Sequence, residues 1–344
     1  MSMRIGVVGL GRIGQLHARN VVLEAPDAEL VLIGRSVDRL DATRKSLTVS
    51  LSAESEVEAE PKISMRTLSD AWADGLDGVI ISTSTGTHPD LTRYAVEHGV
   101  PCLVEKPLSL DLAEIPQLSE QLESHGVPIM VAFHRRYDEG HQRLRQRIRS
   151  GSMGPIRLIH AVNHDHRHVD PDYIPHSGGI WRDLLIHDFD TIPWLLDDRP
   201  VSVYATGGVL DAEVYSDCDD FDTASAVITF ASGSQALVSG GRNVASGQDV
   251  ATSVYGSDAA FSAGVDDHTP VEPLESGTAP SVTTYEDFMD RFAATFRGEI
   301  RHFLAMVRGE TDSLTPPSAG IVAARLAMAA EESARTGRPT RIEW

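Results

Sequence analysis

The feature that most constrains this chain is a glycine pattern directly after its first apolar run. Residues 5–14 read Ile-Gly-Val-Val-Gly-Leu-Gly-Arg-Ile-Gly, an apolar strand that enters G-x-G-x-x-G and then a helical stretch. In this pattern Gly9 permits a tight turn, Gly11 lets the backbone approach a pyrophosphate, and Gly14 lets the helix pack on the strand. We therefore predict a dinucleotide site at the helix N-terminus. The alternative is a glycine turn with a purely structural role.

Short apolar runs alternate with longer amphipathic ones through the first 133 residues. The predicted strands are 5–10, 30–34, 79–82, 101–105 and 129–133, and the predicted helices are 13–23, 37–47, 88–97 and 112–125. This alternation is typical of a parallel sheet covered by helices. The stretch 50–61, rich in Ser, Glu and Ala, is expected to form an exposed acidic extension before the next short strand.

After residue 133 the pattern changes to short strands separated by Gly, Ser and Asp turns. The predicted strands are 156–162, 201–209, 224–230, 235–240 and 251–255, the predicted helices are 140–150, 178–196, 288–308 and 318–335, and 262–284 is expected to be a loop. These segments predict a second, largely antiparallel domain. We therefore expect an α/β chain with two domains, residues 1–130 and 131–344.

Composition narrows the class of protein. A chain of 344 residues, 41% hydrophobic and 23% charged, is long enough for two folded domains. Thirty Lys and Arg against fifty Asp and Glu give a net charge of −20, which would repel a nucleic-acid backbone. Two cysteines are too few for a disulfide scaffold. With no apparent signal peptide or apolar membrane span, we expect a cytoplasmic protein with no nucleic-acid or membrane partner.

The residues after the second strand bear on the choice between NAD and NADP. An acid at this position would bind the ribose 2′-hydroxyl of NAD, whereas this chain has Arg35 and Ser36. An arginine can pair with a 2′-phosphate and stack on adenine, and the serine can add a hydrogen bond. We therefore predict a preference for NADP. The alternative is that Arg35 only stacks or faces solvent and that NAD is used.

Three further motifs carry a family resemblance. Residues 105–107 read Glu-Lys-Pro at the end of a strand, 178–188 read Gly-Gly-Ile-Trp-Arg-Asp-Leu-Leu-Ile-His-Asp, and 133–138 read Phe-His-Arg-Arg-Tyr-Asp. With the glycine turn, they make the chain resemble the glucose-fructose oxidoreductase and inositol dehydrogenase superfamily, closest to its inositol 2-dehydrogenase branch. The resemblance covers nearly the whole chain. It implies an N-terminal Rossmann domain, a C-terminal α/β domain with a large open sheet, and an active site in the cleft between them.

The resemblance assigns three residues to the reaction. Lys106 matches the lysine of the family's E-K-P motif, and Asp183 and His187 match its D-x-x-x-H motif; in the family the three surround the hydroxyl that is oxidised. The chemistry agrees, because on a helix Asp183 and His187 would project from one face. The imidazole could then accept the hydroxyl proton while the lysine stabilises the alkoxide. The alternatives are a surface contact for the pair and a solvated lysine.

Other positions are carried over as binding residues. The expected cofactor-binding set is Gly9, Gly11, Arg12, Ile13, Gly14, Arg35, Ser36, Ser82, Thr83, Thr85, His88, Glu105 and Lys106. The expected substrate-binding set is His134, Arg135, Asp165, His166 and Gln248. Gln248 replaces a tyrosine of the inositol branch, and Phe296 and Arg297 replace its Tyr-Asp, so we expect a polyhydroxylated ring, an inositol or a pyranose. For Arg135 and Arg136, a phosphate-like site and a structural ion pair are both open.

A run of alternating histidines offers a different interpretation. On a strand His164, His166 and His168 would all face one way, and two histidines at this spacing can share a Zn²⁺ ion. Hydride transfer with a histidine base needs no metal. We therefore expect no metal, and hydrogen bonds from one or two of these imidazoles to substrate hydroxyls.

Three functions remain compatible with these observations. We predict a dehydrogenase that transfers hydride between a cyclic polyol or sugar and a nicotinamide cofactor, with His187 as general base. The second is a glycosidase of the same superfamily, which oxidises its sugar transiently and returns the hydride. The third is a non-catalytic nucleotide sensor or scaffold, which Lys106, Asp183 and His187 argue against. Since the strands of the second domain are too apolar to leave a whole face wet, we also expect a homodimer or homotetramer.

Overall fold

The computed structural model describes residues 2–52, 60–68, 72–271 and 283–344. The chain divides into two compact units, the first formed by residues 1–134 and 296–321 and the second by residues 135–295 and 322–344. The expected division at residue 130 placed 296–321 in the second domain, whereas this segment returns to pack with the first unit. Within the expected acidic extension, 50–52 close a helix and 53–59 lie outside the described residues.

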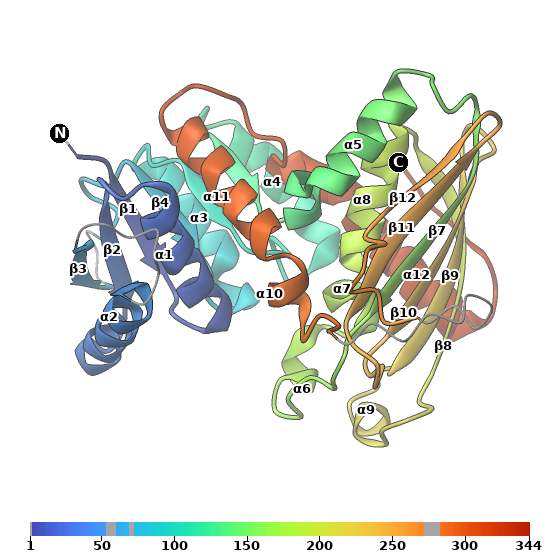
Figure 1. Ribbon diagram of the computed structural model, residues 1–344, viewed down its shortest axis with the longest axis horizontal. Helices are drawn as coiled ribbons and strands as arrows, with labels where there is room; N and C mark the ends of the chain where they lie inside the picture. Colours follow the sequence, from blue (N-terminus) through green and yellow to red (C-terminus); the bar gives the residue numbers. More distant parts are fainter. Residues whose placement is uncertain (1, 53–59, 69–71, 272–282) are drawn as a thin grey trace. The chain divides into compact units, whose positions relative to one another are not determined.

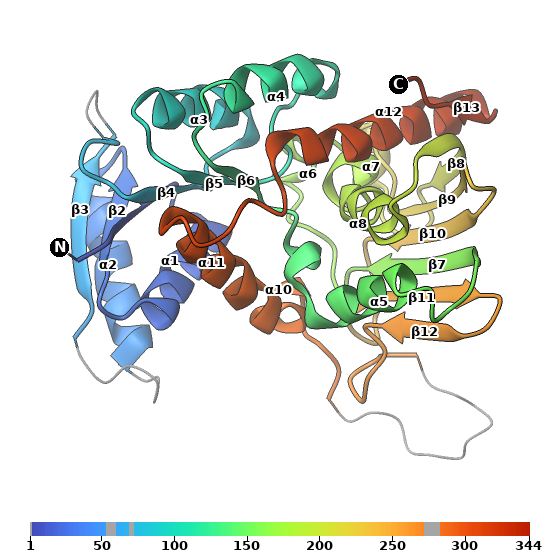
Figure 2. The same cartoon turned by 90° about the horizontal axis from the view of Figure 1, so that it is seen from above.

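The first unit is built on a parallel six-stranded sheet in the order β3-β2-β1-β4-β5-β6 (Figure 1 and Figure 2). The strands are β1 (Arg4–Val8), β2 (Glu29–Gly34), β3 (Lys62–Thr67), β4 (Gly78–Ile81), β5 (Cys102–Val104) and β6 (Ile129–Val131). The residues of β4, β5 and β6 are all buried, because helices cover both faces of the sheet. The predicted parallel α/β architecture is confirmed.

Helices lie on both faces of this sheet. They are α1 (Arg12–Glu24), α2 (Val37–Ser52), α3 (His88–Glu97), α4 (Ile115–Glu123) and α11 (Ala293–Val307), with short 3-10 turns η1 (Thr85–Thr87), η2 (Leu112–Glu114) and η4 (Pro317–Ala319). Figure 2 shows α3 and α4 on one face and α1 and α11 on the other. The helix predicted over 288–308 is two helices in the structure, of which α11 is the longer.

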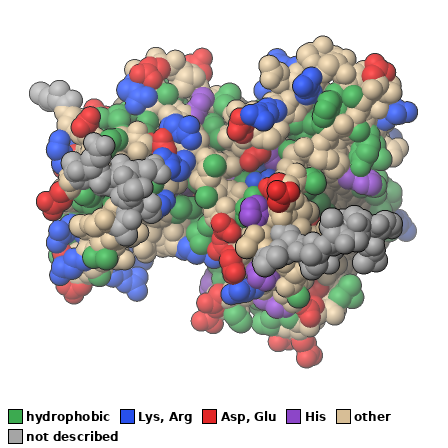
Figure 3. Space-filling view, in the orientation of Figure 1, with side chains coloured by type: hydrophobic (Ala, Val, Ile, Leu, Met, Phe, Trp, Pro, Cys, Tyr) green, Lys and Arg blue, Asp and Glu red, His purple; other side chains and the backbone are tan. Residues whose placement is uncertain are grey.

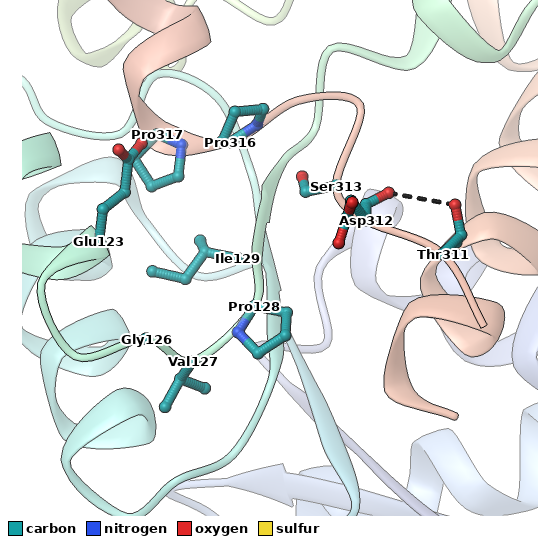
Figure 4. Close-up of a pocket in the computed structure, with 10 residues that line it drawn as sticks. All are labelled: Glu123, Gly126, Val127, Pro128, Ile129, Thr311, Asp312, Ser313, Pro316 and Pro317. Atoms are coloured by element: carbon teal, nitrogen blue, oxygen red, sulfur yellow. Dashed lines mark hydrogen bonds between the residues drawn. The ribbon is translucent and has the colours of Figure 1, made fainter. Parts of the chain in front are cut away.

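The chain that follows α11 covers the edge strand β6. The backbone N–H of Val131 donates to the carbonyl of Thr315 at 2.7 Å. A cavity of about 200 Å³ opens here, lined among others by Pro128, Ile129 and Pro316 (Figure 4). It lies at the amino end of β6, so in a parallel sheet it is at the opposite edge from the glycine turn, which follows the carboxyl end of β1. This cavity is therefore not part of the expected nucleotide site.

The second unit is built on a seven-stranded sheet in the order β12-β11-β7-β10-β9-β8-β13. The strands are β7 (Ile156–His164), β8 (Pro200–Gly208), β9 (Thr223–Phe230), β10 (Gln235–Gly241), β11 (Asp249–Gly256), β12 (Ala260–Ala263) and β13 (Thr340–Arg341). Of its described strand pairs, β7 with β10 is parallel and the others are antiparallel. The predicted antiparallel character is confirmed. The loop predicted over 262–284 begins inside β12, and its residues 272–282 lie outside the described chain.

The helices of the second unit are mostly short. They are η3 (His134–Tyr137), α5 (Glu139–Arg149), α6 (Ile174–Ser177), α7 (Ile180–Asp183), α8 (Ile186–Leu196), α9 (Val214–Asp217), α10 (Phe288–Arg291) and α12 (Gly320–Thr336). Figure 2 shows α5, α8 and α12 on one face of the seven-stranded sheet. These helices therefore shield this face of the sheet from water.

The surface carries both signs of charge. Asp and Glu side chains stand among Lys and Arg side chains on the face seen in Figure 3. Across the described residues, the helices all fall short of the length and apolarity that a bilayer crossing requires.

Candidate functional site

The glycine turn has the geometry that a dinucleotide requires. Gly9 adopts a left-handed φ of 89°, and a Cβ there would lie 2.6 Å from the carbonyl oxygen of Ser82. A Cβ on Gly14 would lie 1.9 Å from the carbonyl oxygen of Gly9, so only glycine allows α1 to pack this closely. In contrast, a Cβ on Gly11 would meet no atom of the described chain within 4 Å. The turn is thus tight on its protein side and open on the side that a ligand would approach.

The start of α1 favours an anion. The helix begins at Arg12, after Gly11 in extended conformation, and among the described residues no side chain caps it and no acid lies in its first turn. The backbone N–H groups of this turn, including that of Ile13, form the positive end of the helix dipole. The residues present therefore fit the pyrophosphate of a dinucleotide.

Neighbouring strands bring other predicted residues to the same edge. The N–H of Gly9 donates to the carbonyl of Ile33 at 3.3 Å, so Arg35 and Ser36, which follow β2, lie beside the turn. Arg35 is exposed. The hydroxyl of Ser82, after β4, donates to the carbonyl of Gly9 at 2.8 Å. Ser82 therefore supports the turn, while Arg35 faces solvent, where a ribose phosphate could meet it.

The loops after β4 and β5 are tied together by His88. This histidine is buried, with Nδ1 2.9 Å from the carbonyl oxygen of Pro107 and Nε2 3.1 Å from that of Thr83. Thr85 begins η1 in the same loop. Both ring nitrogens of His88 thus contact the protein backbone. We conclude that His88 holds the loop that carries Lys106, whereas the sequence pattern placed it against the cofactor.

Glu105 is bound to α1. Its Oε1 lies 2.7 Å from Nε2 of His17, a fully buried residue of that helix. Burial by itself raises the pKa of Glu105, but the hydrogen bond and charge of His17, with Lys106 nearby, leave that pKa below its usual value. The acid of the E-K-P motif is therefore held ionised inside the first unit, next to Lys106.

Two replacements expected in the sugar pocket pack inside the first unit. The ring of Phe296 is buried and stacks on His134, with centroids 4.8 Å apart and an interplanar angle of 20°. Arg297 forms an ion pair with Glu24 of α1. These contacts hold α11 against α1. His134, expected to bind substrate, is itself buried in this stack.

The second unit gathers polar residues at one edge of its sheet. Because β7 and β10 are parallel and His164 lies beside Gly241, Asp165 and Arg242 are the first residues beyond two adjacent strand ends. Strand β11 runs antiparallel to β7 and begins beside His164, so Gln248, the residue before it, lies at the same edge. Three distant stretches of sequence thus meet at one point.

The amide of Gln248 is used by the protein. Its Oε1 accepts a hydrogen bond from the backbone N–H of His166 at 3.1 Å, and its Nε2 donates to Oδ1 of Asp165 at 3.1 Å. Gln248 therefore orients Asp165 rather than offering a free amide, although it was expected to bind substrate.

Asp183 is held by two donors that the sequence analysis did not include. Its Oδ1 accepts from the hydroxyl of Tyr173 at 3.0 Å, and its Oδ2 accepts from Nη1 of Arg242 at 3.0 Å. Arg242 is fully buried, and the same Nη1 lies 3.7 Å from Oδ2 of Asp165. In the sequence, Arg242 is a charged residue directly after an apolar strand. Patterns that predict strands assign such a residue to a turn.

Asp183 and His187 do not lie on one continuous helix, contrary to the expectation. Asp183 ends α7, and His187 lies in the first turn of α8. The chain breaks between them because the N–H of Leu185 bonds to the carbonyl of Ile180, five residues back, at 2.9 Å. His187 is half-buried.

The two arginines after His134 are structural ion pairs. Arg135 is buried and its Nη1 donates to Oδ1 of Asp188 at 2.6 Å. Arg136 makes two hydrogen bonds to Asp190, at 2.9 and 2.6 Å. Of the two possibilities left open, the structure therefore favours the ion pair, and both pairs anchor α8, the helix of His187.

The alternating histidines do not share a strand. Strand β7 ends at His164, whose Nε2 lies 3.0 Å from the Ser239 hydroxyl. His166 Nδ1 lies 3.0 Å from the carbonyl oxygen of Glu286, and His168 contacts Asp211. Each imidazole thus turns to a different partner. In the part of the chain that the structure describes, no group of three or more His, Cys, Asp or Glu gathers as a metal site would require.

Comparison with known proteins agrees with this fold. Residues 3–133 match the family described as an oxidoreductase family with an NAD-binding Rossmann fold, and residues 141–262 match the GFO/IDH/MocA C-terminal domain. The inositol 2-dehydrogenase of Rhizobium meliloti is 33% identical over 347 residues, 99% of this chain and 100% of that protein. This chain belongs to the GFO/IDH/MocA oxidoreductase family. The resemblance drawn from the motifs is confirmed, and residues 3–133 of the first unit match the family's NAD-binding Rossmann fold.

Two further relatives span the whole chain. The scyllo-inositol 2-dehydrogenase (NAD(+)) of Bacillus subtilis is 33% identical over 99% of this chain and 97% of its own. The crystal structure of a myo-inositol dehydrogenase from Corynebacterium glutamicum superposes with a TM-score of 0.85 at 28% identity and covers 100% of both chains. The likeness to inositol dehydrogenases therefore extends through both units.

Proposed function

We propose that this member of the family is a nicotinamide-dependent dehydrogenase that oxidises a CH–OH group of an inositol or a similar cyclic polyol. The observation that carries the proposal is Asp183, whose two carboxylate oxygens are held by Tyr173 and Arg242 in the motif that also contains His187. Its support is that relatives along the full length are named as inositol dehydrogenases.

In the proposed reaction the C–H bond of the alcohol gives up a hydride, and its O–H bond gives up a proton. When bound, the nicotinamide supplies the acceptor for the hydride. His187 accepts the hydroxyl proton, since an imidazole has a suitable pKa near neutrality. Asp183 orients that imidazole, and Lys106 donates a hydrogen bond to the oxygen as negative charge develops on it.

We propose that the chain uses NADP⁺ at least as well as NAD⁺. Arg35 stands exposed after β2, beside the glycine turn, where NAD-selective sites carry an acid. A guanidinium at this place can pair with a 2′-phosphate. One relative has NAD(+) in its name. A comparison of NAD⁺ with NADP⁺ therefore tests what Arg35 of this chain does.

We also propose that a second copy of the chain covers the open face of the seven-stranded sheet. The helices lie on the other face (Figure 2). On the open face Val227 lies beside both Tyr204 and Leu237, and the three side chains are 37%, 44% and 37% exposed, respectively. A row of apolar side chains across adjacent strands is typical of a surface that another subunit buries.

The cysteines support the proposed reducing, cytoplasmic compartment. Cys102 and Cys218 are both free. Burial raises the pKa of Cys102 to about 12, so its thiol stays protonated.

The experiment that tests the function is a screen of myo-inositol, scyllo-inositol and glucose with NAD⁺ and NADP⁺. The absorbance of the reduced nicotinamide measures turnover. We expect turnover with at least one inositol. Hydrolysis of an aryl glycoside without net reduction would favour the glycosidase instead. Cofactor binding with neither activity would favour a sensor.

A further inference from the structure

Arg242 lies at the centre of the charges of the second unit. Its side chain is 1% exposed, although a guanidinium is strongly hydrated when free. Nη1 lies 3.0 Å from Asp183 Oδ2 and 3.7 Å from Asp165 Oδ2. Asp220 is a third carboxylate whose charge acts on it. The surrounding carboxylates stabilise this buried cation, and the cation fixes the positions of the carboxylates.

The hydrogen bond of Arg242 is directed at Asp183. Among the described residues, Nε and Nη2 of Arg242 are buried without a partner, whereas Nη1 donates to Asp183. A guanidinium with a purely structural role would be expected to use more of its five N–H groups. The hydrogen bond of this buried arginine thus goes to Asp183, in the D-x-x-x-H motif, and Asp165 is a second, more distant partner.

Tyr173 completes the grip from the other side. Its hydroxyl donates to Oδ1 of Asp183 at 3.0 Å, so each carboxylate oxygen has its own donor. Two donors on different oxygens fix the plane of the carboxylate, because rotation about the Cβ–Cγ bond would break both bonds. Tyr173 is exposed and precedes α6, whereas Arg242 follows β10, so the two donors come from separate elements.

The position of α7 depends on the same cluster. Oδ1 of Asp220 accepts a hydrogen bond from the backbone N–H of Ile180 at 2.8 Å, at the start of the helix that ends at Asp183. Burial lowers the pKa of Arg242, but the charges of Asp183, Asp165 and Asp220 raise it more, so the guanidinium stays charged. The cation is therefore permanent, and its neighbours are oriented around it.

We propose that Arg242, assisted by Tyr173, is a positioning residue that fixes the orientation of the Asp183 carboxylate at the end of α7. The inference rests on the proposed function, in which His187 takes the hydroxyl proton. Since Asp183 is expected beside the reacting hydroxyl and the proposed base, loss of either donor should lower kcat more than it raises KM. A misplacement of about 1 Å in a reacting group can cost on the order of 10²-fold in rate.

The test is steady-state kinetics of the full chain with the inositol and cofactor found to be turned over. Arg242→Lys keeps the charge but cannot keep the same fork geometry, and we expect kcat to fall by about 10- to 100-fold. Tyr173→Phe removes one donor and keeps the ring of an exposed residue, and we expect kcat to fall by about 3-fold or more. Arg182→Lys is the matched control, because Arg182 neighbours Asp183 in sequence but pairs with Glu331.

A double-mutant cycle separates positioning from a structural role. On an Asp183→Asn background, Arg242→Lys and Tyr173→Phe should add little to the loss in kcat, since the group they position is already gone. Losses that multiply on that background would overturn the proposal. A rise in KM at unchanged kcat would also overturn it, because Arg242 would then act through Asp165.

Two controls keep the outcome clear. If Arg242→Lys does not fold, as shown by thermal unfolding and cofactor binding, Tyr173→Phe and its cycle with Asp183→Asn decide the proposal. Turnover by the unmodified chain together with unchanged kcat in Arg242→Lys would overturn the inference and leave the proposed function intact. An unmodified chain without turnover would overturn both.

Discussion

Glu105 and His17 join the E-K-P loop to the first helix, with Glu105 Oε1 2.7 Å from His17 Nε2. His17 follows the glycine turn along α1, and Glu105 directly precedes Lys106. The pair therefore links the two segments of the first unit that are expected to touch opposite parts of a dinucleotide. The contact with His17 also stabilises the charged carboxylate of Glu105, because burial alone would favour the neutral form.

His17→Leu should destabilise the first unit by about 1–3 kcal/mol at neutral pH, because Glu105, a partly buried carboxylate, would lose its hydrogen-bonded partner. The folded-state pKa of Glu105 is lowered, so its contribution is present above its ordinary value of 4.5 and lost as the pH falls through the folded value. Denaturant unfolding at several pH values should therefore show the difference from the unmodified chain shrinking in acid. His125→Leu, at an exposed histidine of the same unit, should change little. Equal stability of both variants at neutral pH would contradict the pairing.

The contribution of Glu299 to the stability of the fold has the opposite pH dependence. This residue of α11 is fully buried, and in the described chain neither of its carboxylate oxygens has a hydrogen-bond partner. Burial, and then the charge of Glu105, raise the pKa of Glu299 well above its ordinary value of 4.5. Folding thus retains a proton that the unfolded chain releases, so stability falls as the pH rises from 4.5 toward the folded pKa.

Glu299→Gln should remove this loss. Over that window the free energy of unfolding of the variant should rise, relative to that of the unmodified chain, by roughly 1.4 kcal/mol per pH unit. This is the slope for one proton. Urea unfolding between acid and mildly alkaline pH measures the difference. Glu120→Gln, at an exposed position of α4, serves as the control and should run parallel to the unmodified chain. Parallel curves for Glu299→Gln as well would show that Glu299 is ionised in the fold.

His187→Ala should lower kcat by about 10²–10⁴, the usual range for a lost general base. Lys106→Met should lower it through loss of the hydrogen bond to the developing alkoxide. Because His187 is not among the residues expected to bind the cofactor, the dissociation constant of the cofactor, measured by fluorescence titration, should stay within a few-fold in His187→Ala. His176→Ala, at an exposed histidine of α6, should retain full activity. A fully active His187→Ala enzyme would remove that residue from the proposed mechanism.

Arg35→Asp should reverse the cofactor preference. The change removes a charge-assisted hydrogen bond to a 2′-phosphate, worth about 1.5–3 kcal/mol, and supplies an acid for the 2′-hydroxyl. We expect kcat/KM with NADP⁺ to fall by about 10- to 100-fold and kcat/KM with NAD⁺ to hold or rise. Arg149→Asp, at an exposed arginine of the second unit, makes the same change in net charge and should leave the ratio alone. An unchanged ratio in Arg35→Asp would mean that Arg35 only faces solvent.

The sequence predicted the fold better than it predicted the contacts of the site. Strands such as β4 and β5 are apolar at every position because both faces are covered, and this leaves a clear mark in the sequence. The break between α7 and α8 comes from a hydrogen bond between Leu185 and Ile180, which hydrophobic periodicity does not record. Arg242 was missed for a different reason. It lies beside Asp165 because β7 and β10 pair in parallel, and from there it contacts Asp183 of α7. Strand pairing between distant segments is not visible in a local pattern.

The same reasoning explains why several expected ligands turned inward. Gln248 and His88 were selected by their place in a motif, and both are occupied by backbone or carboxylate partners in the structure. A motif records which residues recur, and it does not separate those that touch a ligand from those that hold the residues that do. Hydrogen-bond partners make that distinction, since a side chain with both ends bound to protein has little left for a ligand.

Val227→Lys and Leu237→Lys should dissociate the proposed assembly. Both side chains lie on the open face of the seven-stranded sheet, in adjacent strands and in register, so a lysine there would bring an ammonium group into the centre of an apolar contact between two copies. Leu210→Lys is the matched control, because Leu210 is 79% exposed in the same unit but lies beyond the end of β8. Light scattering coupled to size-exclusion chromatography should show a dimer or tetramer for the unmodified chain and for the control, and a smaller species for the two sheet variants. Sheet variants that keep the full assembly would place the contact between copies on another surface.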